Sequence, residues 1–151
     1  PMKLAEALLE RRDLQNKLLG LKNTMISQSL IEEGDKLEVS MDELLKEYHI
    51  VNVQLEKIIV GIHEKNQTVI VLETKETLQT TLEKREGYRR EYDVYQQIIS
   101  TQQDQRRFAR NEIKMVPSFS QKELTEKLNE LAKKIRQVDA LIQQTNWRED
   151  F

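Results

Sequence analysis

Two stretches of the chain, eighty positions apart, begin and end alike. One opens at Ser40 with Ser-Met-Asp-Glu-Leu and runs to Asn66, and the other opens at Ser120 with Ser-Gln-Lys-Glu-Leu and runs to Asn146. Each opening is a Ser-x-x-Glu capping box, in which the serine side chain accepts a hydrogen bond from the third amide of a helix. No proline interrupts either stretch over its 26-position span. Two long helices of equal length are therefore expected.

The segments ahead of these two helices also align, at an offset of 74 positions. We therefore predict an all-α fold of four helices from a duplicated αα-hairpin, in a single helical domain of residues 1–151 with pseudo-repeats 1–73 and 74–151. Short connections between long helices make them antiparallel neighbours, either in one long-helix bundle or as two coiled-coil hairpins. The aligned pairs include Leu4 and Leu78, Leu8 and Leu82, and Arg11 and Arg85.

Apolar residues recur at three- and four-residue steps in four segments, which is the spacing of one helix face. We expect a close approach of a neighbouring helix at Gly20, rather than a hinge. The β-branched run at residues 68–72 is predicted to be a buried connector or a short strand. Residues 111–119 are predicted to be extended, because a residue before proline avoids helical torsions. The predicted helices cover residues 3–31, 41–65, 74–108 and 121–146.

Composition narrows the classes of function. Charged residues make up 33% of the chain, with only four glycines and two prolines, which suits long amphipathic helices. The absence of cysteine excludes thiol nucleophiles and cysteine-ligated metals. Neither His49 nor His63 has the Glu-x-x-His spacing of di-iron bundles or the spacing of a zinc protease. We therefore expect no catalytic residues, no cofactor and no metal site.

The distribution of charge and apolar residues bears on location. No apolar run approaches the roughly 18 residues that a membrane span needs. The first residues carry an acid and lack the apolar core of a signal peptide. The net charge of −2 provides no overall field that would attract nucleic acid or anionic membranes. We expect a cytoplasmic protein without a membrane span, and nucleic acid is the less favoured partner.

Arg11 and Arg85 fall at matching positions on the apolar seam of the two repeats. A charged group there must be paired or must extend its head to water. We expect each stem to pack and each guanidinium to pair with a carboxylate on the second or the fourth helix. The alternative is a functional anion site on the pseudo-twofold axis.

A basic cluster with an interleaved aromatic residue spans residues 106–114. It could bind nucleic-acid phosphates while Phe108 stacks on a base. The region of residues 32–47 carries seven acids against two lysines. We favour pairing of these opposite charges, within the chain or between subunits, over nucleic-acid binding or a plain solvated surface. The candidate residues of the cluster are Arg106, Arg107, Arg110, Glu112 and Lys114.

Three motifs of the chain are distinctive: residues 3–8 with Arg11 and residues 13–15, then Arg110-x-Glu112-Ile113-Lys114-x-Val116-Pro117, and finally Ile142-Gln143-x-Thr145-Asn146-Trp147. Together they resemble the septicolysin-like family of small uncharacterised bacterial proteins. The resemblance implies an all-helical protein of unknown role, with no catalytic residues or cofactor to carry over. The cytolytic activity in the family name requires a thiol, and the chain has no cysteine.

Asn146 and Trp147 lie where the last predicted helix ends, whereas the motif from Arg110 to Pro117 lies where that helix begins. A straight helix of this length spans roughly 40 Å, so one chain with straight helices cannot join the two motifs. A second copy running the other way could join them; alternatively, Trp147 folds back on the connector at 69–72. We predict a cytoplasmic helical scaffold or interaction protein that forms a homo-oligomer, with an unknown protein partner. The alternatives are a nucleic-acid-binding accessory protein and, least favoured, a membrane-active protein.

Overall fold

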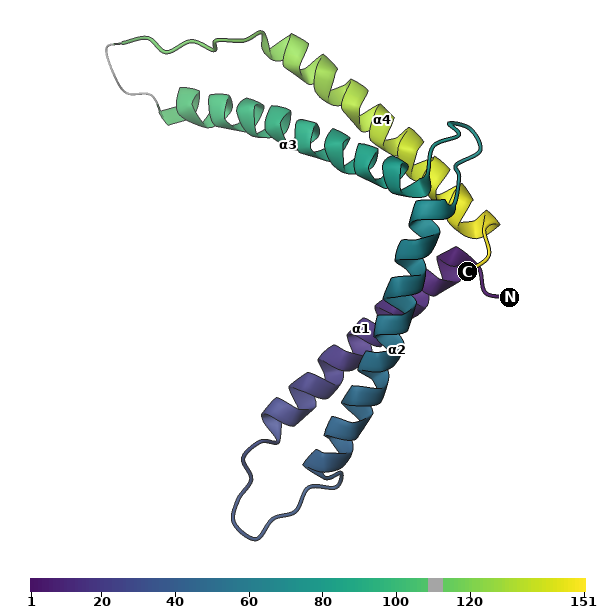
Figure 1. Ribbon diagram of the computed structural model, residues 1–151. Coiled ribbons are helices and arrows are strands. Elements are labelled where there is room, and N and C mark those ends of the chain that lie inside the picture. The colour runs from purple at the N-terminus through teal and green to yellow at the C-terminus, as the bar shows by residue number, and fades with distance from the viewer. Residues whose placement is uncertain (109–112) are drawn as a thin grey trace. The chain divides into compact units, whose positions relative to one another are not determined.

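The fold is carried by four helices, seen in a computed structural model (Figure 1). The structure describes the backbone of residues 1–108 and 113–151, and the side chains of residues 1–104 and 113–151. No strand occurs among these residues, so the predicted all-α class is confirmed. The helices are α1 (Leu4–Ser27), α2 (Met41–Thr68), α3 (Leu78–Phe108) and α4 (Gln121–Arg148).

The helices form two antiparallel hairpins, α1 with α2 and α3 with α4, which confirms the predicted hairpin architecture (Figure 1). Contacts divide the chain into two compact units. The first unit contains Pro1–Val69 and Asn146–Phe151, and the second contains Ile70–Thr145. The prediction of a single domain over residues 1–151, with repeats 1–73 and 74–151, is not decided by this division and stays a prediction.

The second helices of the two hairpins match in length and in their start. α2 and α4 begin 80 positions apart and end 80 positions apart. The Ser40 hydroxyl oxygen accepts from the Glu43 amide at 3.2 Å, and the Ser120 hydroxyl oxygen accepts from the Glu123 amide at 3.3 Å. These are the serine halves of the two predicted capping boxes. The same type of serine cap therefore starts both helices, which have equal length.

The first helix ends at Ser27, four residues before the predicted boundary at 31. The Ser27 hydroxyl donates to the Thr24 carbonyl at 2.9 Å. The Ile26 carbonyl accepts from both the amide and the hydroxyl of Ser29, at 3.3 and 2.8 Å. Serine hydroxyls that bond to nearby carbonyls compete with the helical pattern in this way. The next apolar residues, Leu30 and Ile31, therefore belong to the loop.

The third helix begins at Leu78 rather than at the predicted residue 74, because Thr77 caps it. The Thr77 hydroxyl oxygen accepts from the Thr80 amide at 3.1 Å, which satisfies one of the free amides of the first turn. Lys75, just before it, has φ of 61°, outside the helical region. α2 and α4 continue to Thr68 and Arg148, slightly beyond the predicted ends at 65 and 146.

The segments that follow α2 and α4 make corresponding hydrogen bonds. The Val71 amide donates to the Glu76 carbonyl at 2.8 Å in the second unit. In the first unit the Phe151 amide donates to the Met2 carbonyl at 2.7 Å. The donors are 80 positions apart and the acceptors 74 positions apart, which are the two offsets of the repeat. The β-branched run is therefore a connector with an isolated bridge from Ile70 to Thr77.

Two glycines of the first unit differ in their surroundings. Nothing lies within 4 Å of a Cβ built on Gly20, so the predicted close approach at this position is wrong. A Cβ on Gly61 would lie 2.6 Å from the ring of Phe151, nearer than real contacts allow. A glycine on α2 is therefore what lets the C-terminal aromatic ring lie against that helix.

Candidate interaction site

Arg85 lies on α3 and is paired across its hairpin. Its Nη1 lies 3.2 Å from Asp139 Oδ1 on α4, and its Nε lies 3.5 Å from Glu86 Oε1. The side chain is only 22% exposed. Arg89 extends the group with Nη2 at 3.9 Å from the same Asp139 oxygen. The predicted pairing of this arginine with a carboxylate of the fourth helix is therefore present.

Arg11, the counterpart of Arg85, is half-buried on α1. Within the described residues it forms no ion pair, so the expected carboxylate partner on the second helix is not found. The reason lies in the sequence, because the position on α2 that corresponds to Asp139 is Ile59. The alternative of an anion site formed by both arginines is not tested and stays a prediction.

The basic cluster is only partly within the described structure. Arg106 and Arg107 belong to α3, but their side chains lie outside the described residues, as do Arg110 and Glu112 entirely. Lys114 is exposed in the segment before α4. Nucleic-acid binding and charge pairing by this cluster both stay predictions.

The two residues of the C-terminal motif have opposite environments. Asn146 is 5% exposed, whereas Trp147, the next residue on α4, is 53% exposed. The fully buried Thr145 beside them donates its hydroxyl to the Leu141 carbonyl at 2.7 Å. Asn146 is therefore part of the packed structure, and Trp147 is the motif residue with surface to offer a partner.

Two exposed lysine–carboxylate pairs lie near the starts of α1 and α3. Lys3 donates to Asp150 at 2.8 Å, and this hydrogen bond lowers the pKa of the Asp150 carboxyl below its ordinary value. Lys84 donates to Glu76 at 2.6 Å, which raises the pKa of the Lys84 ammonium. Both pairs support the segments that enter the helices.

The loop of residues 28–40, which joins α1 to α2, combines exposed apolar and acidic side chains; we call it the acidic loop. Leu30 is 90% exposed, and Ile31 and Val39 are also exposed. The exposed acids are Glu32, Glu33, Asp35 and Glu38, against the single Lys36.

The segment of residues 113–119, which leads into α4, is apolar as well; we call it the apolar segment. Four of its seven residues are exposed large apolar side chains, and its charged residue is Lys114. Exposed apolar clusters of this kind mark interaction sites more often than single exposed residues do. The four side chains are Ile113, Met115, Val116 and Phe119.

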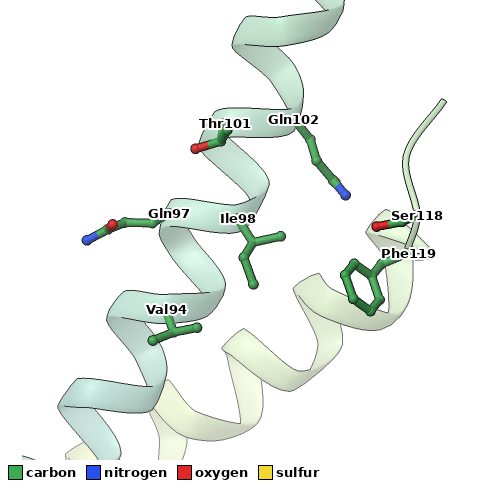
Figure 2. A pocket seen from close by; sticks show the side chains of 7 residues that line it. All are labelled: Val94, Gln97, Ile98, Thr101, Gln102, Ser118 and Phe119. Atoms are coloured by element: carbon green, nitrogen blue, oxygen red, sulfur yellow. The ribbon is translucent and has the colours of Figure 1, made fainter. Parts of the chain in front are cut away.

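A hollow of about 430 Å³ lies between α3 and the start of α4 (Figure 2). Its apolar wall consists of Val94, Ile98 and Phe119. The Gln102 side chain extends from α3 toward Ser118 (Figure 2). Its Oε1 atom is buried and has no hydrogen-bond partner among the residues that the structure describes. The remaining lining residues are Gln97, Thr101 and Ser118.

The sequence interpretation missed this hollow, although a signal was present. Val94, Ile98, Thr101 and Gln102 follow the i, i+4, i+7, i+8 spacing of one helix face. The pattern was not recognised because two of the four residues on this face, Thr101 and Gln102, are polar. The acidic charge of the loop was recognised from the sequence, but its exposed apolar residues Leu30 and Ile31 were not, because the first helix was predicted to extend to residue 31.

The outer face of α2 carries another hollow of about 480 Å³, lined by Asp42, Leu45, Lys46, His49 and Ile50. Across the described part of the chain, no three acidic or histidine side chains gather as metal ligands would. Over that same part, none of the helices is long and apolar enough to cross a membrane.

The family of the chain follows from comparison with known proteins. Residues 11–151 match the model of a family of unknown function, DUF6847. The chain belongs to this family. The septicolysin-like resemblance was therefore wrong, since the match over nearly the whole chain is to this family and no septicolysin-like relative was found. A DUF6847 assignment carries no activity, so it adds no catalytic residue to the site.

A solved structure of high similarity supports the fold of this DUF6847 member. It is the crystal structure of a functionally unknown conserved protein from Corynebacterium diphtheriae, with a TM-score of 0.91 and 27% sequence identity. The alignment covers 98% of this chain and 97% of that one. The chain matches none of the curated proteins with which it was compared.

Proposed function

We propose that this protein is a helical interaction protein that self-associates and acts as a scaffold in the cytoplasm. One observation carries the proposal: each hairpin ends in a loop with exposed apolar side chains, and the two loop regions differ in charge. The acidic loop has four acids and one lysine. The cluster at residues 106–114, which leads into the apolar segment, has four basic residues and one acid.

Complementary charge and exposed apolar surface make separate contributions to association. Apolar burial stabilises a complex, whereas opposite charges accelerate the encounter and select its orientation. Exposed ion pairs alone contribute little. Both features are present at each loop region, and this combination supports association between copies more than association with a purely basic or purely apolar partner.

Light scattering over a series of protein concentrations tests the proposal. We expect the average mass to rise above the 17.9 kDa of one chain as concentration increases, and to fall again when salt screens the charges. A mass of one chain at high micromolar concentration and low salt would contradict the proposal.

A further inference from the structure

We propose that the hollow beside Phe119 is the docking site for the acidic loop of a second copy, with Leu30 as the inserted side chain. This inference rests on the proposed self-association and specifies its contact. It places the loop of the first hairpin of one copy on the second hairpin of another, which is a heterologous contact between different surfaces.

The hollow has the composition of a site for a single apolar side chain with polar neighbours. Val94, Ile98 and Phe119 provide an apolar wall, and Val94 and Phe119 are exposed, so the wall is open to a partner (Figure 2). A volume of about 430 Å³ is within the range of protein ligand sites. An aliphatic side chain fits this wall better than a charged group does, because desolvating a charge is costly.

The side-chain oxygen of Gln102 needs a hydrogen-bond donor. Buried polar atoms in native proteins are nearly always hydrogen-bonded, yet Oε1 of Gln102 has no partner within the described chain. In the acidic loop, the backbone amides of Leu30 and Ile31 donate to no acceptor among the described residues. Because this oxygen is buried, the Gln102 side chain has to turn toward the open side of the hollow before a loop amide can donate to it. That hydrogen bond would then satisfy both groups.

The charges favour this loop as the occupant. Four exposed acids follow Leu30 and Ile31 within residues 32–38, and Lys114 is exposed in the segment that provides Phe119. In the sequence, Arg106, Arg107 and Arg110 follow the lining residue Gln102 by four, five and eight positions. Together with Lys114, these arginines outnumber the acids nearby in the sequence, Asp93, Asp104 and Glu112, so an acidic loop gains steering that a basic or an uncharged loop does not.

Two single variants and their mixture test the contact. Leu30→Asp damages the loop and leaves the hollow intact, whereas Val94→Asp damages the hollow and leaves the loop intact. Both positions are exposed, so neither change disturbs a core. We expect each variant alone to associate at least about tenfold more weakly than the unchanged chain, from the lost burial of one apolar side chain. We expect the mixture to recover a one-to-one complex.

A matched control is Leu45→Asp, an exposed leucine on α2 outside both surfaces, which should associate like the unchanged chain. Gln102→Leu, which removes the acceptor, should weaken association several-fold. Normal association of Val94→Asp would overturn this inference and leave the proposed function standing. A mixture that stays at the mass of one chain would also overturn it, since the two changes would then damage one shared surface. Monomeric behaviour of the unchanged chain would overturn both proposals.

Discussion

The two hairpins follow one backbone plan with different side-chain chemistry. In α2 the seam residues Leu55 and Ile58 are buried, whereas their α4 counterparts Ile135 and Val138 are half-buried. The apolar side chains between α1 and α2 are therefore more completely buried than those between α3 and α4. Since apolar burial is the main favourable term in folding, the first hairpin should depend on it more strongly.

The first helices of the hairpins show the same contrast. Leu18 on α1 is buried, and its counterpart Tyr92 on α3 is half-buried. Tyrosine has an apolar ring and a hydroxyl that needs a partner or water. Polar contacts also join α3 to α4, since Lys134 lies 5.7 Å from the centre of the Tyr88 ring and Arg85 pairs with Asp139. The same hairpin geometry is therefore stabilised mainly by buried leucines between α1 and α2, and partly by polar side-chain pairs between α3 and α4.

The outer faces of the helices differ in the same sense, with the first hairpin again the more apolar. The helices of the first hairpin expose six large aliphatic residues, and each corresponds to a polar residue or alanine in the second hairpin. The helices of the first hairpin thus expose more apolar surface to other molecules, and they also bury their seam residues more completely. The six are Leu9, Leu19, Ile26, Leu45, Ile50 and Val60, and their counterparts are Glu83, Asp93, Ser100, Thr125, Glu130 and Ala140.

Truncation of matched seam residues should give the largest contrast. Leu55→Ala should cost about 2–5 kcal/mol, the usual loss for a buried leucine. Ile135→Ala at the corresponding position should cost less than half as much, because the side chain is half-buried. Denaturant unfolding of the two variants measures the difference. Equal losses in the free energy of unfolding would show that the seam between α3 and α4 is as well buried as the seam between α1 and α2.

Substitution of the paired arginine should have a smaller effect. Arg85→Ala should cost about 1–2 kcal/mol, since it removes stem packing and leaves Asp139 with only Arg89 at 3.9 Å. Arg85→Met should cost less, because the stem is kept and the guanidinium no longer needs desolvation. The matched control is Arg11→Ala, which breaks no ion pair. Thermal midpoints report all three, and equal shifts for Arg11→Ala and Arg85→Ala would contradict the contrast.

The helix caps should behave alike in the two hairpins. Ser40→Ala and Ser120→Ala should each cost about 1 kcal/mol, the typical value of a capping side chain. Ser118→Ala is the control, because Ser118 lies two residues before the cap. Urea unfolding gives the three values. A larger loss at Ser118 than at Ser120 would mean that the cap of α4 has been misplaced.

The glycines should give the smallest effects, with opposite signs. Gly20→Ala should stabilise by about 0.5–1 kcal/mol, because the helix interior there has open space for a Cβ. Gly61→Ala should not stabilise, since the new Cβ would meet the Phe151 ring at 2.6 Å. Paired thermal melts measure the two shifts. Stabilisation by both changes would show that the ring does not lie against α2.

The sequence predicted the helices well and the interaction surface poorly, for physical reasons. Ser40 and Ser120 carry a local capping signal, so the starts of α2 and α4 were found to the residue. Serine hydroxyls ended α1 early by bonding to their own turn, which periodicity does not reveal. The partner of Arg85 required knowing which residue of α4 faces it. The hollow could not be predicted from the sequence, because it depends on how Phe119 lies relative to α3 in three dimensions.

The most direct measurement of the central claim is disulfide trapping between copies. The chain has no cysteine, so introduced cysteines report on one site each. Chains with Leu30→Cys are mixed with chains with Val94→Cys and oxidised, and Leu45→Cys replaces Leu30→Cys as the control. The account predicts a reducible heterodimer joining residues 30 and 94, because a disulfide needs Cα atoms within about 7 Å. Trapping of Leu30→Cys no faster than that of Leu45→Cys would contradict it.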